Sequence, residues 1–214
     1  MQKISDFLMF MLLFLIVVSS VGVAGALTVG VKEGDWIEYQ VNITGNVPAE
    51  HNSTWAKLEV MQIEDSIVNL TVTSGFEGSL PIIESIIINL DAGILGDCFI
   101  IPANLKVGDG FFDSRQGNLT IASASQRTVA GSERTLISAA TAETVYFWDQ
   151  ITGILVEAHT VTSDFNMTTQ ATKTNMWQES SPRLVIYAIV VAVILMLITM
   201  AFFVFQKKRF VPSI

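Results

Sequence analysis

The sequence predicts a mainly β protein, in which an antiparallel meander forms an exported domain and one C-terminal helix crosses a membrane. Two observations carry this prediction. An uncharged apolar run extends from Leu184 to Phe205. The chain before it is rich in Thr, Val and Ile, and apolar and polar residues alternate there with the period of half-buried strands. The meander suits either a sandwich or a curved half-barrel.

The apolar run is long enough to cross a bilayer. A helix over residues 184–205 would measure about 33 Å at roughly 1.5 Å per residue, against a hydrocarbon core of about 30 Å. The basic cluster Lys207–Arg209 follows at once and marks the cytoplasmic side. A buried core helix is the alternative, but such helices are rarely this long or this free of polar residues. We therefore expect a single-pass type I protein of the plasma membrane, with residues 206–214 as a cytoplasmic tail.

The first 26 residues have the features of a signal peptide. Lys3 supplies the positive start, Phe7 to Val18 is the apolar core, and Ala24-Gly25-Ala26 fits a cleavage site. An uncleaved signal anchor is the alternative. In either case we expect residues 27–177 to be an extracellular β domain and residues 178–183 to be a short linker to the membrane.

Composition limits the partners and the covalent chemistry of the exported part. The chain holds 20 acidic and 12 basic residues, a net charge of −8, and every acidic residue except Asp6 lies between the two apolar segments. Such a surface repels nucleic acid and anionic lipid. Cys98 is the only cysteine, so no internal disulfide forms. Its apolar neighbours predict a small buried side chain.

Three strands are expected in the first part of the exported domain. Trp36–Thr44 alternates cleanly, with Ile37, Tyr39 and Val41 toward the core. Trp55–Ile63 is the second strand, and the third contains Val68, Leu70 and Val72.

The stretch from Pro81 to Pro102 is ambiguous. Its isoleucines fit one face of a helix, but the density of β-branched residues favours a strand. We expect strands at Ile86–Leu90 and Cys98–Ile101, separated by a turn at Asp91–Gly93. A second membrane span is excluded by three acidic residues, Glu84, Asp91 and Asp97.

The remainder is expected to continue the meander. A hairpin turn is predicted at Asp149–Gly153, where Gly153 supplies a positive φ. The expected strands are Leu119–Val129, Glu133–Trp148 with a bulge at Ala139-Ala140, Ile154–Met167 and Thr168–Trp177.

One short pattern occurs twice. Val31–Ile37 and Leu105–Phe111 share the order apolar, Lys, any residue, Gly, Asp, any residue, apolar. Gly-Asp is a good turn before a strand, which accounts for the pattern without any symmetry. A two-part structure is the alternative. In both cases we expect Asp35 and Asp109 to cap their own turns.

Five N-x-[ST] sequons occur, all in the exported part, and we expect glycosylation if the host has that pathway. Those that fall on expected strands lie on the polar face. Thr-rich strand sequence that happens to contain Asn is the alternative. The five residues are Asn42, Asn52, Asn69, Asn118 and Asn166.

No pattern typical of an enzyme, a cofactor site or a metal site occurs. The two histidines, His51 and His159, are not part of H-E-x-x-H, and there is no G-x-S-x-G, P-loop or G-x-G-x-x-G. We expect His159 to be a satisfied surface or half-buried strand residue. No D-x-D-x-D-G loop supports a calcium site.

Two resemblances add to this interpretation. Tyr146–Glu157 resembles a hairpin of the lipoprotein-carrier half-barrel proteins of the LolA and LppX type, whose pattern is W-x-D-x-x-T-G-x-P-x. Here Trp148 adjoins Asp149, and Leu155 replaces the usual Pro. The chain is also similar to uncharacterised archaeal surface-anchored β proteins at Gly30–Tyr39 and Ile101–Asp109. The first resemblance implies a strongly curved sheet with an apolar concave face; the second implies no established activity.

Together these features favour a cell-surface binding or envelope-structural module without enzymatic activity. Carriage of a lipid or other apolar ligand in a half-barrel cleft is the first alternative, and an extracellular hydrolase is the second. The expected partners are the membrane and a lipid or protein ligand, and no nucleic acid or cofactor. If the cleft exists, we expect it to be bordered by Ile83, Ile86, Ile88 and Phe99.

Overall fold

The computed structural model describes residues 27–47, 52–76, 78–177 and 190–196. The predicted signal peptide, linker and tail lie outside the described residues, as does most of the predicted membrane span. Within the described residues no helix is both long and apolar enough to cross a membrane; residues 190–196 are helical.

The described chain is mainly β, as the sequence predicted. The strands are β1 Trp36–Gly45, β2 Ser53–Glu64, β3 Ile67–Phe76, β4 Ile82–Asn89, β5 Gly110–Asp113, β6 Gly117–Thr120, β7 Ser123–Val129, β8 Ser132–Ala140, β9 Thr144–Asp149, β10 Leu155–Val161 and β11 Phe165–Thr174.

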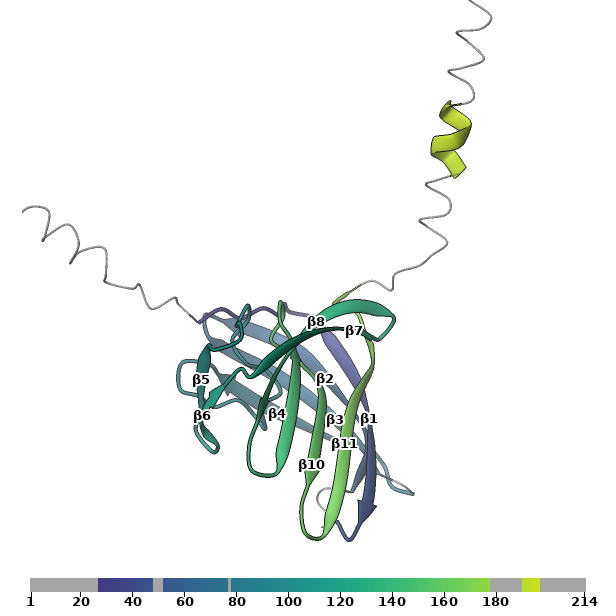
Figure 1. Ribbon diagram of the computed structural model, residues 1–214. Helices are drawn as coiled ribbons and strands as arrows, with labels where there is room; N and C mark the ends of the chain where they lie inside the picture. Colours follow the sequence, from purple (N-terminus) through teal and green to yellow (C-terminus); the bar gives the residue numbers. More distant parts are fainter. Residues whose placement is uncertain (1–26, 48–51, 77, 178–189, 197–214) are drawn as a thin grey trace, which may run out of the picture.

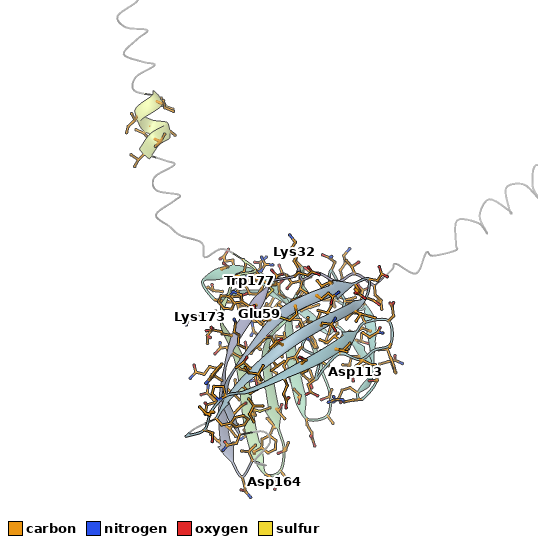
Figure 2. The ribbon with its side chains drawn as sticks, turned by 180° about the vertical axis from the view of Figure 1, so that it is seen from behind. Lys32, Glu59, Asp113, Asp164, Lys173 and Trp177 are labelled. Carbon is orange, nitrogen blue, oxygen red and sulfur yellow. The ribbon has the colours of Figure 1, made fainter. Side chains whose placement is uncertain are left out.

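Nine of these strands form one antiparallel sheet in the order β4-β3-β2-β1-β11-β10-β9-β8-β7, and β5 and β6 form a separate hairpin. The first and last strands, β1 and β11, meet in the middle of the sheet, which leaves β4 and β7 as its edges. The sheet is not closed, but it curves until β8 to β11 lie in front of β2 and β3 (Figure 1). The two ends of the domain lie together, since Lys32 and Trp177 are at one end of the sheet and Asp164 is at the other (Figure 2).

Alternation of apolar and polar residues places the core on the concave face. Ile37, Tyr39, Leu58 and Leu70 are buried there from one half of the sheet, and Trp148 from the other. Neighbouring strands pair their backbone N–H and carbonyl groups along each ladder, which allows apolar side chains to be buried beside them.

The chain between β4 and β7 covers this concave face. Its buried side chains join the core of the sheet; they are Leu90, Leu95, Cys98, Ile100, Ile101, Phe111, Leu119 and Ile121. Trp148 contacts this segment in two ways: its indole N–H donates to the Cys98 carbonyl at 2.7 Å and its ring packs edge to face against Phe111. The segment also packs closely on β4, in the other half of the sheet. Gly96 lies so near this strand that an added Cβ would be only 3.2 Å from Ile86 Cγ2.

The strand expected at Cys98–Ile101 is wrong. Asp97 and Cys98 have φ values of 58° and 62°, which lie in the left-handed region and end any extended conformation. Ile100 makes only an isolated bridge to Ile154. The stretch is apolar because it is buried between the two halves of the sheet, and burial alone does not require a strand.

Three strand boundaries in the second half also differ from expectation. Glu133–Trp148 is not one bulged strand but two, β8 and β9, joined by a turn in which the Thr144 N–H donates to Thr141 Oγ1. Leu119–Val129 is divided between β6 and β7. The last hairpin, between β10 and β11, turns at Thr162, whose hydroxyl accepts the Phe165 N–H at 3.1 Å. This turn comes several residues before the boundary expected between Met167 and Thr168.

The repeated pattern forms the same turn twice. The Asp35 carboxylate accepts the Lys32 N–H at 2.8 Å, and the Asp109 carboxylate accepts the Lys106 N–H at 2.8 Å. The glycine before each aspartate has a positive φ, 83° and 93°. Both aspartates therefore cap their own turns, as predicted.

Candidate functional site

A groove lies between the end of β7 and strands β10 and β11, which are not hydrogen-bonded to β7. Its volume is about 260 Å³. The lining residues are Arg127, Thr128, Val129, Ala130, Val156, Glu157, Gln170 and Ala171.

Arg127 holds β7 against β10. Its guanidinium lies 4.4 Å from the centre of the Phe147 ring and donates to Glu157 Oε2 at 3.2 Å. Both contacts are possible because Phe147 and Glu157 are direct cross-strand partners in the β9–β10 ladder. The groove is thus bounded by an ion pair whose carboxylate is only 16% exposed.

A row of polar side chains continues from the groove across the sheet. Glu157 and His159 alternate with the buried Ala158, so they point away from the core. The His159 imidazole contacts Glu157 through Nε2 and lies 3.3 Å from Thr168 Oγ1 through Nδ1. His159 is thus a half-buried, hydrogen-bonded strand residue, as its position in the sequence predicted.

The Thr168 hydroxyl, the His159 imidazole and the Glu157 carboxylate contact one another in the same order as the three groups of a hydrolase triad. Two features argue against that chemistry here. Thr168 and His159 do not line the groove, so no bound substrate would be enclosed beside the hydroxyl. Thr168 also pairs with both neighbouring strands, which occupies the backbone N–H groups that an oxyanion would need. The three side chains form a hydrogen-bonded row on the sheet, and of the three only Glu157 lines the groove.

Sequence reasoning did not find this groove. Glu157 and His159 are two residues apart on one strand, which places them on one face, but nothing in the sequence brings Arg127 to them. That contact depends on the curvature of the sheet and on the path of β7. Within the described residues no group of His, Cys, Asp and Glu side chains could hold a metal ion.

The four residues expected to border an apolar cleft are not all on one face. Ile88 is fully buried, and Ile86 and Phe99 pack against the core. Ile83 is 69% exposed and, by alternation along β4, lies on the opposite face from Ile86 and Ile88. The core pocket lined by Trp36, Leu58 and Ile154 among others has no room for a water molecule.

The sequon residues lie where a glycan could be attached. Asn42, Asn69 and Asn166 are on β1, β3 and β11, on the face opposite the core, and Asn69 is the only one of the five that is half-buried. Asn52 precedes β2, and Asn118 is on β6.

The turn that carries the resemblance to lipoprotein carriers has a structural role. Asp149 is 1% exposed, and its carboxylate accepts two hydrogen bonds from the Arg134 guanidinium at 2.7 and 2.9 Å. It also accepts the Thr152 N–H and hydroxyl at 2.9 and 2.8 Å. Gly153, with φ of 70°, approaches the Ile101 backbone so closely that a Cβ would lie 2.1 Å from its carbonyl oxygen.

Arg134 links that turn to the end of the domain. Its guanidinium lies 4.9 Å from the centre of the Trp177 ring, and the Trp177 indole N–H donates to the Val129 carbonyl at 3.3 Å. The last residues of the domain are therefore fixed to the β7–β8 hairpin, beside the groove.

Two buried groups are stabilised in their neutral forms. Burial, followed by the nearby Asp113 carboxylate, raises the pKa of the Cys98 thiol to about 12. Burial also raises the pKa of Tyr39, whose hydroxyl donates to the Leu155 carbonyl at 2.7 Å. Cys98 is buried, as the sequence predicted, and its thiol donates to Asp113 Oδ2 at 3.7 Å.

No family model, curated protein or solved structure was found to match this chain. The resemblances to lipoprotein carriers and to archaeal surface-anchored proteins accordingly stay predictions.

Proposed function

We propose that this chain is a membrane-anchored cell-surface protein whose β domain binds a small, neutral, polar ligand in the groove between β7 and β10–β11. The observation that carries the proposal is the contrast between the concave face of the sheet and the groove beside β7. The concave face is covered by the protein's own chain, whereas the groove stays open and is lined by the polar side chains of Arg127, Thr128, Glu157 and Gln170 beside four apolar residues.

The lining of the groove supports a ligand with hydroxyl or amide groups. Arg127 and Thr128 offer donors, and Glu157 and Gln170 offer acceptors. The charges of Arg127 and Glu157 offset each other, which favours a neutral ligand over an ion. The volume of about 260 Å³ is just below the roughly 300–1,000 Å³ of sites for drug-sized ligands. A single sugar residue of a cell-surface glycan fits this description better than an acyl chain, which needs an apolar lining.

Carriage of an apolar ligand is the second candidate. It is favoured by the curvature of the sheet and by the apolar concave face on which the resemblance to carriers depends. It would require the segment between β4 and β7 to leave the core, because that segment occupies the space an acyl chain would take. This requirement makes the binding module the better supported of the two.

Membrane anchoring is tested by the accessibility of tags. The full chain is expressed with a tag after Ile214, and intact cells are treated with protease. We expect the β domain to be digested and the tag to be spared. Loss of the tag while the β domain remains would reverse the proposed orientation.

Ligand binding is tested by filling the groove. Saturation-transfer NMR with a panel of neutral monosaccharides is measured on the full chain and on Gln170→Trp, with Gln62→Trp as the matched control on an exposed site of β2. We expect at least one sugar to bind the wild type and the control but to lose most of its signal with Gln170→Trp. Equal signals from all three proteins, or no signal from the wild type, would show that the groove does not bind these sugars.

A further inference from the structure

One edge of the sheet is unusually apolar. β4 carries a single charge, Glu84, and its residues Ile82, Ile83 and Ile87 are 49%, 69% and 62% exposed. Edge strands are commonly protected by lysine, proline or a covering element, because their free backbone groups pair readily with another strand. Between Ile82 and Ile88, β4 has no lysine or proline, and within the described residues no other strand pairs with its outer edge there, so this edge is open to pairing with another strand.

The backbone of β4 shows which residues are free to pair. At its end, the Asn89 N–H donates to the Ile94 carbonyl at 2.8 Å and the Ile94 N–H returns a bond of 2.9 Å, so Asn89 points away from β3. Backbone groups alternate in direction along a strand. Ile83, Ser85 and Ile87 therefore direct their N–H and carbonyl groups to the open edge, and within the described residues nothing accepts or donates to them.

These three residues are arranged symmetrically about Ser85. Two antiparallel copies of β4 can pair with Ser85 opposite Ser85, Ile83 opposite Ile87 and Ile87 opposite Ile83. All the free groups are then used, in about six hydrogen bonds. Moving the register by one step in either direction brings Pro81, which lacks an N–H, or Asn89, which is already paired, into the ladder.

Side chains favour the same register. Ile83 and Ile87, the two most exposed isoleucines of β4, become direct cross-strand partners on the face opposite the core. Glu84 lies opposite Ile86 rather than opposite its own copy, so like charges do not face each other. A contact in which the same patch serves both partners is the requirement for a closed two-fold dimer.

We propose that the protein forms a homodimer by antiparallel pairing of β4 with β4 of a second copy, centred on Ser85. The dimer extends the sheet across both copies and buries the exposed isoleucines of each. This contact is independent of the groove, which lies between β7 and β10–β11.

Cysteine cross-linking of the full chain in detergent tests the register. Cys98 is buried, so a second cysteine on the surface is the only accessible thiol. In the proposed pair the two Ser85 Cα atoms are about 5.5 Å apart, within the range of roughly 4.4–6.8 Å that a disulfide needs. Under mild oxidation Ser85→Cys should give at least about five times more linked dimer than Glu84→Cys or Ile86→Cys. Ser125→Cys on β7, the other edge, is the matched control and should remain monomeric.

Two further variants test the association itself by sedimentation of the full chain. Ser85→Pro removes an N–H that points away from β3, so the β3–β4 ladder is kept while the centre of the dimer loses its hydrogen bonds. Ile87→Lys places a charge on the contact. Each should weaken the dimer by at least about tenfold with an unchanged circular dichroism spectrum. Because the domain is acidic, salt should strengthen the dimer of the wild type.

Several results would overturn the proposal. A monomeric wild type, or equal cross-linking of Ser85→Cys and Ser125→Cys, would show that β4 has no second copy as partner. A linked product of any mass other than twice that of the chain would assign the edge to a different protein. Protection of Ser85→Cys from a maleimide without a dimer would assign it to lipid or detergent.

Discussion

The contact between Asp149 and Arg134 provides the sharpest test of how this domain is held together. The carboxylate is almost fully buried, and Arg134 is its only cationic partner within hydrogen-bonding distance in the described residues. Arg134→Met keeps most of the apolar stem of the side chain but removes the charge. Asp149 is then left with only the two hydrogen bonds from Thr152.

The expected cost can be worked out from these contacts. Removing one partner of a buried ion pair costs about 3–5 kcal/mol, because the remaining charge stays buried without compensation. Loss of the Arg134–Trp177 contact adds about 0.5–1 kcal/mol. We expect a combined loss of about 4 kcal/mol in the free energy of unfolding, because neighbouring terms do not add fully. For a domain of this size that corresponds to a fall in Tm of about 8–16 °C.

The assay is thermal unfolding of the full chain in detergent, followed by circular dichroism and tryptophan fluorescence. Arg115→Met is the matched control, because Arg115 pairs with Asp97 where both side chains are 67% exposed; such surface pairs contribute about 0–1 kcal/mol. Adding Asp149→Asn to Arg134→Met should restore part of the stability, since a neutral amide is cheaper to bury. If Arg134→Met and Arg115→Met lower Tm equally, the reasoning from burial is refuted.

Three further predictions follow from the buried polar groups and the sequons. Tyr39→Phe should lower the free energy of unfolding by about 1 kcal/mol in urea titrations, because the hydroxyl that donates to the Leu155 carbonyl is lost; an unchanged value would mean that this bond contributes nothing. The pKa of Cys98 is raised from 9.0 to about 12, so the folded state favours the neutral thiol. The neutral thiol's contribution to the free energy of unfolding is therefore complete below pH 9 and is lost as the pH rises toward 12. The decline in urea midpoint over that range should be smaller in Cys98→Ala, and an equal decline would contradict the prediction. In a glycosylating host, each Asn→Gln change at a used sequon should raise gel mobility without unfolding the domain, and unchanged mobility throughout would count against glycosylation; the four positions to test are Asn42, Asn69, Asn118 and Asn166.

Strands with a regular alternation were predictable from the sequence. The predicted strands at Trp36–Thr44 and Trp55–Ile63 closely match β1 and β2. Each strand has one buried and one exposed face, so apolar and polar residues alternate along it with a period of two. The turn at Asp149–Gly153 was predictable for a different reason, because a positive φ strongly favours glycine.

Buried irregular segments and contacts between distant strands were not predictable. Cys98–Ile101 is apolar enough for a strand, but its backbone turns, and sequence pattern records burial rather than backbone direction. The turn between β8 and β9 contains no Gly or Pro; the Thr141 hydroxyl supplies the hydrogen bond instead. The groove required Arg127 of β7 to reach Glu157 of β10, which depends on the curvature of the whole sheet.

The pairing of β1 with β11 limits when this domain can fold. The hydrogen bond from Thr174 Oγ1 to the Trp36 carbonyl joins residues 138 positions apart, and the whole ladder shares this long separation. Contacts of that kind form slowly, because a large loop must close before they are made. Until Phe165–Thr174 emerges, β1 keeps an open edge and the apolar side chains of β1 to β4 lack half of their core. If the chain is exported as a growing polypeptide, the domain therefore completes its fold only after nearly all of it has crossed the membrane, and its first half depends until then on whatever prevents aggregation outside the cell.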